Sequence, residues 1–335
     1  MGKLDLNTSH NLHVVMYHYV RDFGNTRYPE IKGLDVKEFE TQLRFLRKNF
    51  NIIRMENLFE NLYTPENLPT NAALLTFDDG YKDHIDYVLP LLKKYNLQGS
   101  FYPPARVVLE RKVLDVNKIH LLLASIQDKI QLVNSIFLLI DNYAGEHKLR
   151  TSQEYWQDLA RSDSWDTAET VFIKRVLQRD LPEEVRAVFV DKLFKKHVNE
   201  SEEELCTELY LNKAEIKEMV REGMHFGGHG HNHYWLGHLN DKEQAMEISS
   251  TLSFLKECGV DTSSNWSFCY PYGDYNNSTL EILKSLNCTI GLTTAPGAAC
   301  FNQYSALEIS RYDTNDFPPK TKESQFFRKV NIPQP

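Results

Sequence analysis

Two short motifs in this chain contain side chains with which a protein could hold and use a metal ion. The first is TFDDG, residues 76–80, in which Asp78 and Asp79 end an apolar run. A buried carboxylate is costly unless it is paired or bound to a metal. One of the two could therefore bind a metal while its neighbour contacts the attacking water. Asp-Asp-Gly is also common turn chemistry, which is the simpler alternative.

The second motif is rich in histidine. Five of the twelve histidines lie between His225 and His238. His229 and His233 are four positions apart, so on a helical turn both imidazoles would share one face. This is a recurring way to place two zinc ligands. The alternative interpretation is a solvated, histidine-rich loop.

Two imidazoles and one carboxylate would leave one position on the metal open, as catalytic sites require. Such a metal lowers the pKa of a bound water to about 7 and polarises a carbonyl oxygen. A nearby carboxylate can then act as general base. The motifs together predict metal-assisted hydrolysis of an acyl group. The ligand set favours one divalent metal, zinc first, and it also accepts cobalt, nickel or iron.

The elements that must position these motifs alternate between strand and helix. The predicted strands are apolar or β-branched runs at 13–20, 71–79, 99–104, 224–231, 266–273, 288–294 and 306–313. The predicted helices have amphipathic periods at 36–50, 83–96, 241–259 and 278–287. Such alternation implies a parallel sheet, and the polar motifs follow strand ends, where barrel active sites lie. We therefore expect an α/β fold, a distorted (β/α) barrel of about seven parallel strands.

Residues 105–220 have a different hydrophobic pattern from the rest of the chain. Helical periods separated by polar breaks fill this segment, and it has almost no strand signal. We interpret it as a helical insertion that serves as a lid or a substrate-specificity element. The barrel is then made from residues 1–104 and 221–335.

The composition excludes some classes of protein. The 335 residues are 41% hydrophobic and 25% charged, as in globular proteins, and the net charge of −8 argues against a nucleic-acid partner. The N-terminus lacks the apolar stretch of a secretory signal, and the longest apolar run, 136–140, is far too short to span a bilayer. The five cysteines are odd in number, widely spaced and without a C-x-x-C pair, which indicates buried free thiols in a reducing compartment: Cys206, Cys258, Cys269, Cys288 and Cys300. We therefore expect a cytoplasmic protein without a transmembrane segment.

The order TFDDG, H-x-x-x-H and YPYG resembles the polysaccharide deacetylase family (NodB-type, carbohydrate esterase family 4). The resemblance covers both outer parts of the chain and leaves 105–220 outside. It implies that Asp78 is the base and Asp79 a metal ligand, with His229 and His233 completing the ligand set. It also implies hydrolysis of the N-acetyl group of an acetamido sugar in a glycan or glycan precursor.

The third motif departs from the family pattern. Residues 269–273 read CYPYG, with Cys269 where the family has Arg and Tyr270 in place of Pro. The resemblance implies that the backbone N–H of Tyr272 contributes to an oxyanion hole. The missing Arg normally orients the catalytic Asp. Arg311 is the candidate replacement, and a structural ion pair is the alternative.

The family usually has its general acid, a histidine, near the C-terminus, but this chain has no histidine after Arg311. The sequence YHY near the N-terminus resembles the branch of poly-N-acetylglucosamine deacetylases with circularly permuted motifs. His18 is therefore the candidate acid for the leaving amine, with a hydrogen-bonded core histidine as the alternative. The candidates for contact with the sugar are Tyr270, Tyr102 and Trp235, although core packing is the commoner role of such rings.

Two other functions stay open. The same metal site could hydrolyse an O-acetyl ester, or another amide of a small molecule, since the acyl group is what meets the metal. The chain could also be a non-catalytic glycan-binding module on a degenerate deacetylase fold. The departure at Cys269 supports that interpretation, and the intact pairs of aspartates and histidines oppose it.

Overall fold

The computed structural model describes residues 12–163, 166–299 and 306–330. The chain divides into two compact units, of which the first contains residues 1–22, 33–111 and 206–335. The second contains 23–32 and 112–205.

A ring of parallel strands forms the centre of the first unit. In the described part of the chain its strands are β1 (Leu12–Tyr17), β5 (Ala72–Asp78), β6 (Ser100–Tyr102), β7 (His225–Phe226), β8 (Trp266–Cys269), β9 (Cys288–Leu292) and β10 (Tyr312–Asp313). The order β10-β1-β5-β6-β7 is one sheet, and β8 pairs with β9. Isolated parallel bridges from Gly228 to Phe268 and from Leu292 to Ile309 connect the two parts. The strands thus form the barrel-like arrangement that the sequence predicts, with its two sheets joined by isolated bridges.

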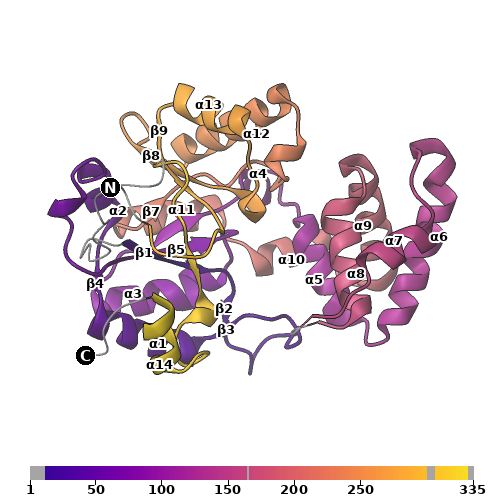
Figure 1. Cartoon of the computed structure of the whole chain (residues 1–335), viewed down its shortest axis with the longest axis horizontal. Helices are drawn as coiled ribbons and strands as arrows, with labels where there is room; N and C mark the ends of the chain where they lie inside the picture. The colour runs from indigo at the N-terminus through magenta and orange to yellow at the C-terminus, as the bar shows by residue number, and fades with distance from the viewer. Residues whose placement is uncertain (1–11, 164–165, 300–305, 331–335) are drawn as a thin grey trace, which may run out of the picture. The chain divides into compact units, whose positions relative to one another are not determined.

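Helices cover the outside of this barrel. α12 (Asp241–Glu257) and α13 (Asn277–Ser285) lie over β8 and β9, whereas α1 (Val36–Asn49) and α3 (Leu89–Tyr95) lie on the opposite side (Figure 1). Every residue of β1 and β5 is buried, which explains why both strands read as continuous apolar runs rather than alternating ones.

Several elements of the first unit are short. They are β2 (Val20–Arg21), β3 (Leu34–Asp35), β4 (Asn51–Ile52), α2 (Met55–Glu60), α4 (Ala105–Leu109), α11 (Lys213–Arg221) and α14 (Glu323–Val330), with single turns η1 (Pro65–Asn67), η4 (Leu236–His238), η5 (Pro271–Gly273) and η6 (Thr314–Asp316). The helix predicted over 83–96 begins as a π-helical turn, η2 (His84–Val88), and restarts as α3 with Pro90 in its first turn. Proline has no N–H to continue the earlier ladder. The strand predicted over 306–313 is reduced to β10 and the bridge at Ile309.

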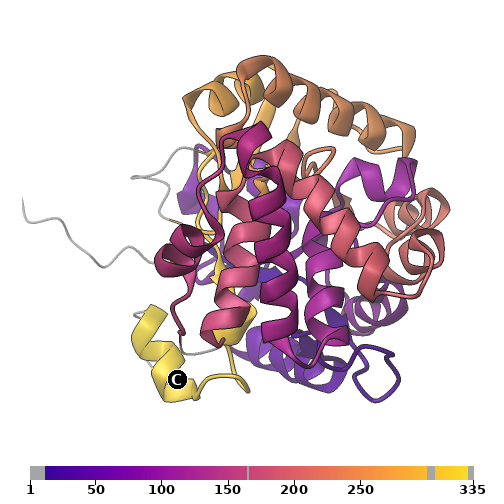
Figure 2. The same cartoon turned by 90° about the vertical axis from the view of Figure 1, so that its right-hand side faces the viewer.

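The second unit is helical. Its elements are α5 (Asp115–Ser125), α6 (Lys129–His147), α7 (Ser152–Leu159), α8 (Ala168–Arg175), the π-helical turn η3 (Val176–Asp180) and α9 (Glu183–His197), which pack side by side (Figures 1 and 2). α10 (Glu202–Leu209) crosses the division between the units. The segment Phe23–Lys32 also belongs to this unit, where Lys32 forms an ion pair of 2.8 Å with Asp166. The segment predicted as an insertion, 105–220, overlaps this unit over 112–205.

Four of the five cysteines lie in the described part of the chain. Cys206, Cys258, Cys269 and Cys288 are buried, and Cys300 lies outside the described residues. Among the helices that the structure describes, none is both long enough and apolar enough to cross a membrane.

His13 makes the folded barrel sensitive to acid. Its ring packs against Phe50 and Tyr312, with centroids 5.0 and 5.8 Å apart. Neither ring nitrogen has a hydrogen-bond partner, and burial lowers the pKa of His13 from 6.5 to about 4. Between those pH values the unfolded chain binds a proton that the folded chain does not. Stability therefore falls as the pH falls from 6.5 to 4, by on the order of 3 kcal/mol.

We expect His13→Phe to remove this contribution, because phenylalanine keeps the packing and does not titrate. Urea unfolding of both proteins from pH 7.5 to 4 measures it. The free energy of unfolding of the wild type should fall relative to the variant below pH 6.5, and the two should run parallel above it. Parallel curves over the whole range would contradict the prediction.

Candidate active site

The end of β5 places two carboxylates in one buried region. Asp78 is the last residue of the strand, and Asp79 follows it with φ of 68°. This left-handed backbone, uncommon for a residue with a side chain, turns the chain sharply after Asp78. Gly80 continues the turn with φ of 67°, and a Cβ there would lie 2.5 Å from the Cβ of Pro103. Strained backbone of this kind persists where the surrounding structure enforces it, often at functional sites.

The two histidines lie on a loop. The helical turn considered for His229 and His233 does not form, since the chain between β7 and η4 has no helical residue before Leu236. Left-handed residues at Gly230, with φ of 72°, and His233, with φ of 63°, curl the loop instead. The spacing of four thus brings both imidazoles together by a different backbone path.

Three potential ligand atoms converge at this point. Oδ1 of Asp79 lies 3.4 Å from Nε2 of His229 and 3.3 Å from Nε2 of His233. All three residues are buried, and their ligand atoms lie within 4.8 Å of one another. Oδ1 of Asp79 has no hydrogen-bond partner. A buried polar atom normally has one, so a divalent metal held by these three atoms fits the site.

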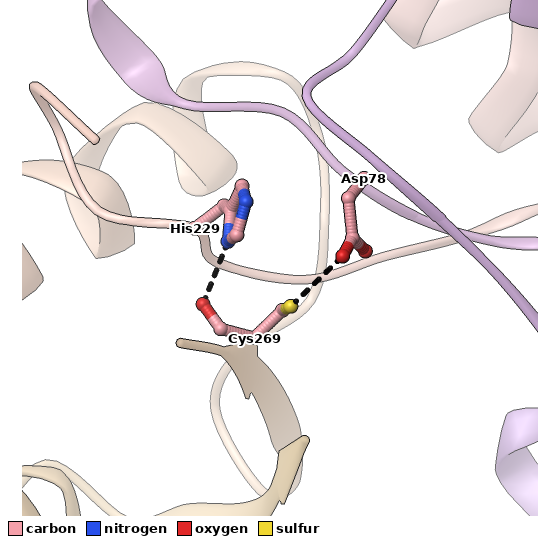
Figure 3. Close-up of side chains that lie close together, drawn as sticks. All are labelled: Asp78, His229 and Cys269. Atoms are coloured by element: carbon pink, nitrogen blue, oxygen red, sulfur yellow. Dashed lines mark hydrogen bonds between the residues drawn. The ribbon is translucent and has the colours of Figure 1, made fainter. Parts of the chain in front are cut away.

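Neighbouring groups fix the orientation of two of these ligands. Nδ1 of His229 lies 2.7 Å from the carbonyl oxygen of Cys269 (Figure 3). If Nδ1 carries the proton and donates it there, Nε2 keeps a lone pair for a metal. The hydroxyl of Tyr81 donates to Oδ2 of Asp79 at 2.7 Å. Sequence reasoning missed Tyr81, because a buried aromatic residue near a strand end resembles core.

Arg311 holds the other carboxylate. Its Nη1 lies 2.9 Å from Oδ1 of Asp78, and its Nη2 lies 2.8 Å from Oδ2. The guanidinium is 1% exposed and also donates to the carbonyl oxygen of Thr293. Burial would raise the pKa of Asp78, but Arg311, His229 and His18 outweigh it and lower the pKa to about 2. Asp78 is therefore ionised at neutral pH.

Cys269 occupies the place beside this pair. Its Sγ lies 3.3 Å from Oδ2 of Asp78 (Figure 3) and 3.1 Å from Nη2 of Arg311. The set Asp78, His229 and Cys269 could also surround an ion by distance alone. A metal is disfavoured there because the guanidinium already occupies both Asp78 oxygens and faces the sulfur. Burial also raises the pKa of the Cys269 thiol, which keeps it protonated.

Arg311 and His229 share the task of balancing the two carboxylates of the described site. Burial would lower the pKa of His229, but Cys269 and Asp79 outweigh it and hold the pKa well above its usual value, so a divalent metal would have to displace that proton. Asp78 and Asp79 are both buried, and only Arg311 offsets them with a permanent charge. Burial would raise the pKa of Asp79, but His229 and His233 hold it well below its usual value. Burial lowers the pKa of His233, which favours the neutral imidazole that a metal requires.

The remaining predicted site residues fall into two groups. His18 follows β1 with its Nε2 3.9 Å from Oδ2 of Asp78, and its side chain is 41% exposed. Tyr272 has φ of 58°, and its ring lies 4.6 Å from that of His233. Trp235, partly exposed, stacks on Tyr272 at 4.5 Å and 7°. His18 thus lies beside Asp78, and Tyr272 connects Trp235 to His233.

Tyr102 and Tyr270 do not lie in this group as substrate contacts. Both rings are fully buried. The hydroxyl of Tyr102 lies 3.0 Å from that of Ser267, and the hydroxyl of Tyr270 donates to the carbonyl oxygen of Leu307. With no exposed surface, neither ring is placed to stack on a sugar, and the expectation for both is wrong. They pack the barrel.

Comparisons with known proteins find relatives of this chain in one family. A model of the polysaccharide deacetylase family matches residues 66–120 and 184–291, so its gap lies within the helical unit. YxkH of Bacillus subtilis (strain 168) is 20% identical over 293 residues, 87% of this chain and 67% of that protein.

Solved structures share the fold at low identity. Streptococcus pyogenes deacetylase PplD, in complex with acetate, has a TM-score of 0.57 at 17% identity and covers 97% of this chain and 99% of its own. IcaB from Ammonifex degensii has a TM-score of 0.51 at 18% identity, with 94% of each chain covered. The chain therefore contains a polysaccharide deacetylase domain over the matched residues, and these solved structures share its fold.

Proposed function

We propose that the protein is a metal-dependent deacetylase that hydrolyses the N-acetyl group of an acetamido sugar in a glycan or glycan precursor. One observation carries the proposal: the three convergent ligand atoms of Asp79, His229 and His233 lie beside an ionised carboxylate, Asp78. A binding module would need neither the base nor the strained ligand loop. PplD, which shares the fold, was solved with acetate, the product that such a reaction releases.

The proposed metal ligands and the proposed base have separate roles. Asp79, His229 and His233 would hold the metal, zinc first. When bound, the metal would polarise the acyl carbonyl and lower the pKa of the attacking water. Asp78, with a pKa of about 2, is a weak base and needs a water that has been made more acidic in this way. Asp78 takes the proton of that water, and Arg311 keeps the carboxylate ionised and aimed.

Two further groups complete the reaction. The backbone N–H of Tyr272 donates to the carbonyl oxygen as negative charge develops there. His18 protonates the nitrogen as the C–N bond breaks, so the products are acetate and a free amino sugar. Trp235 and Tyr272 form an aromatic wall beside His233 that suits the face of a sugar ring. The helical unit is proposed to select the substrate, and we expect a cytoplasmic site of action.

The test is acetate release from N-acetylated sugars, nucleotide sugars and oligosaccharides by metal-reconstituted wild type and by Asp78→Asn. We expect release by the wild type and a loss in kcat of about 10²–10⁴-fold in the variant. KM should change little, since Asn keeps the shape of the side chain. Release only from O-acetylated compounds would favour the esterase alternative. Stoichiometric metal without turnover of any acyl compound would contradict catalysis.

A further inference from the structure

The loop that carries His229 and His233 needs support from outside itself. It has no helical or strand hydrogen bonds of its own between Gly228 and Leu236. Two of its residues, Gly230 and His233, have left-handed backbone. Backbone N–H and C=O groups in a buried segment must be paired, so partners elsewhere in the unit determine its shape.

Glu247 of α12 supplies the partners for the N–H groups. Its Oε2 accepts from the backbone N–H of His231 at 2.9 Å and of Asn232 at 2.8 Å. Its Oε1 accepts from the side-chain amide of Asn232 at 2.5 Å. Successive N–H groups that converge on one oxygen form an anion-binding nest. Here the anion is a side chain of the same protein.

Burial makes this carboxylate unusual. Glu247 is 6% exposed, and among the described residues no lysine or arginine forms an ion pair with it. A buried carboxylate without a cation is expensive unless strong donors compensate it. Three N–H donors from one loop do so, which ties the position of the loop to α12.

The carbonyl groups of the loop are held by a second helix. The backbone N–H of Ala105 donates to the oxygen of Gly230 at 3.1 Å, and that of Arg106 donates to His231 at 3.0 Å. These are the first N–H groups of α4, which lack partners within the helix. The loop is therefore paired with α4 through its carbonyls and with Glu247 through its amides.

We propose that Glu247 is a positioning residue for the metal site: its carboxylate holds the loop in the curled form that brings Nε2 of His229 and His233 together beside Asp79. The inference rests on the proposed metal-dependent function. Glu247 touches none of the three ligand atoms and acts through the backbone of His231 and Asn232. Partners that orient ligands in this way change metal affinity by about 10–100-fold when they are lost.

Cobalt binding tests this role without substrate. We expect Glu247→Ala to raise the dissociation constant for Co²⁺, measured by visible absorption with a competing chelator, by about 10–100-fold. Glu247→Gln should recover most of the affinity, because its amide oxygen can still accept both backbone N–H groups. Glu243→Ala is the matched control. Glu243 is exposed on the same helix and pairs only with the N-cap, Asn240, so the affinity should stay within about twofold of wild type.

The outcomes separate the two proposals. Wild-type affinity in Glu247→Ala would overturn the positioning role and leave the proposed function standing. The positioning role would also be overturned if Glu247→Ala only lowered the unfolding temperature of the metal-free protein, to the same extent as Glu243→Ala, and left Co²⁺ affinity unchanged. No Co²⁺ absorption in the wild type would overturn both. A spectrum shifted in Glu247→Ala and restored in Glu247→Gln would support the role of Glu247.

Discussion

Replacement of His233 by alanine is expected to abolish metal binding and deacetylation. The imidazole provides one of three convergent atoms, 3.3 Å from the Asp79 carboxylate, and no other described side chain occupies its place. A catalytic metal stabilises the charge of the transition state by several kcal/mol, and each 1.36 kcal/mol is a factor of ten in rate. We therefore expect acetate release to fall by about 10³-fold or more. Metal content by elemental analysis and acetate release measure the two effects.

His238→Ala is the control for this experiment. His238 belongs to the same histidine-rich segment, but it stacks on Trp235 and lies outside the ligand set. Its variant should keep one metal ion per chain. Full metal content in His233→Ala would show that the ligands lie elsewhere. Loss of metal in both variants would show that the effect is not specific to the ligand set.

Arg311→Met is expected to cost both stability and activity. In the wild type, both oxygens of the Asp78 carboxylate are paired with the Arg311 guanidinium. The variant leaves this carboxylate buried without its cation. Breaking a buried pair from one side typically destabilises a protein by about 3–5 kcal/mol. The stability and activity of Arg311→Lys should fall between those of the wild type and Arg311→Met, since lysine keeps the charge and loses the bidentate geometry. Urea unfolding and acetate release measure the effects.

The double variant Asp78→Asn with Arg311→Met distinguishes pairing from packing. With the charge gone from both sides, we expect much of the lost stability to return, while activity stays lost. Strict additivity of the two free-energy changes would mean that the residues do not interact. A fully active Arg311→Met protein would refute the role of Arg311 in orienting the base.

Much of the barrel could be predicted from sequence, because strands buried on both faces leave long apolar runs. Asp78, Asp79 and the histidine segment follow the ends of those runs, and the structure brings Asp79, His229 and His233 together. Arg311 could be proposed as the replacement cation only because Cys269 stands where the family has Arg, and the structure places it against Asp78. In these cases the signal lies in a few consecutive residues.

The rest depends on tertiary contacts that leave no local pattern. Nothing adjacent in sequence marks Glu247, on a helix 15 residues after Asn232, as the partner of the histidine loop. Tyr102 and Tyr270 have the residue type of sugar-stacking side chains, and only the folded structure shows that they are buried. The left-handed turns at Asp79 and His233 were equally hidden, since a spacing of four does not specify a backbone path.

The pairing of Asp78 with Arg311 has a consequence for how the chain is made. The two residues are 233 positions apart, and the strand β10 that follows Arg311 pairs with β1. At typical rates of synthesis, the ribosome needs roughly 10–50 s to add such a stretch. During that time a nascent chain that has already exposed Asp78 has no guanidinium to neutralise it. Fragments that end before Arg311 should therefore remain substrates for chaperones and proteases, and the complete barrel should form only after β10 has emerged.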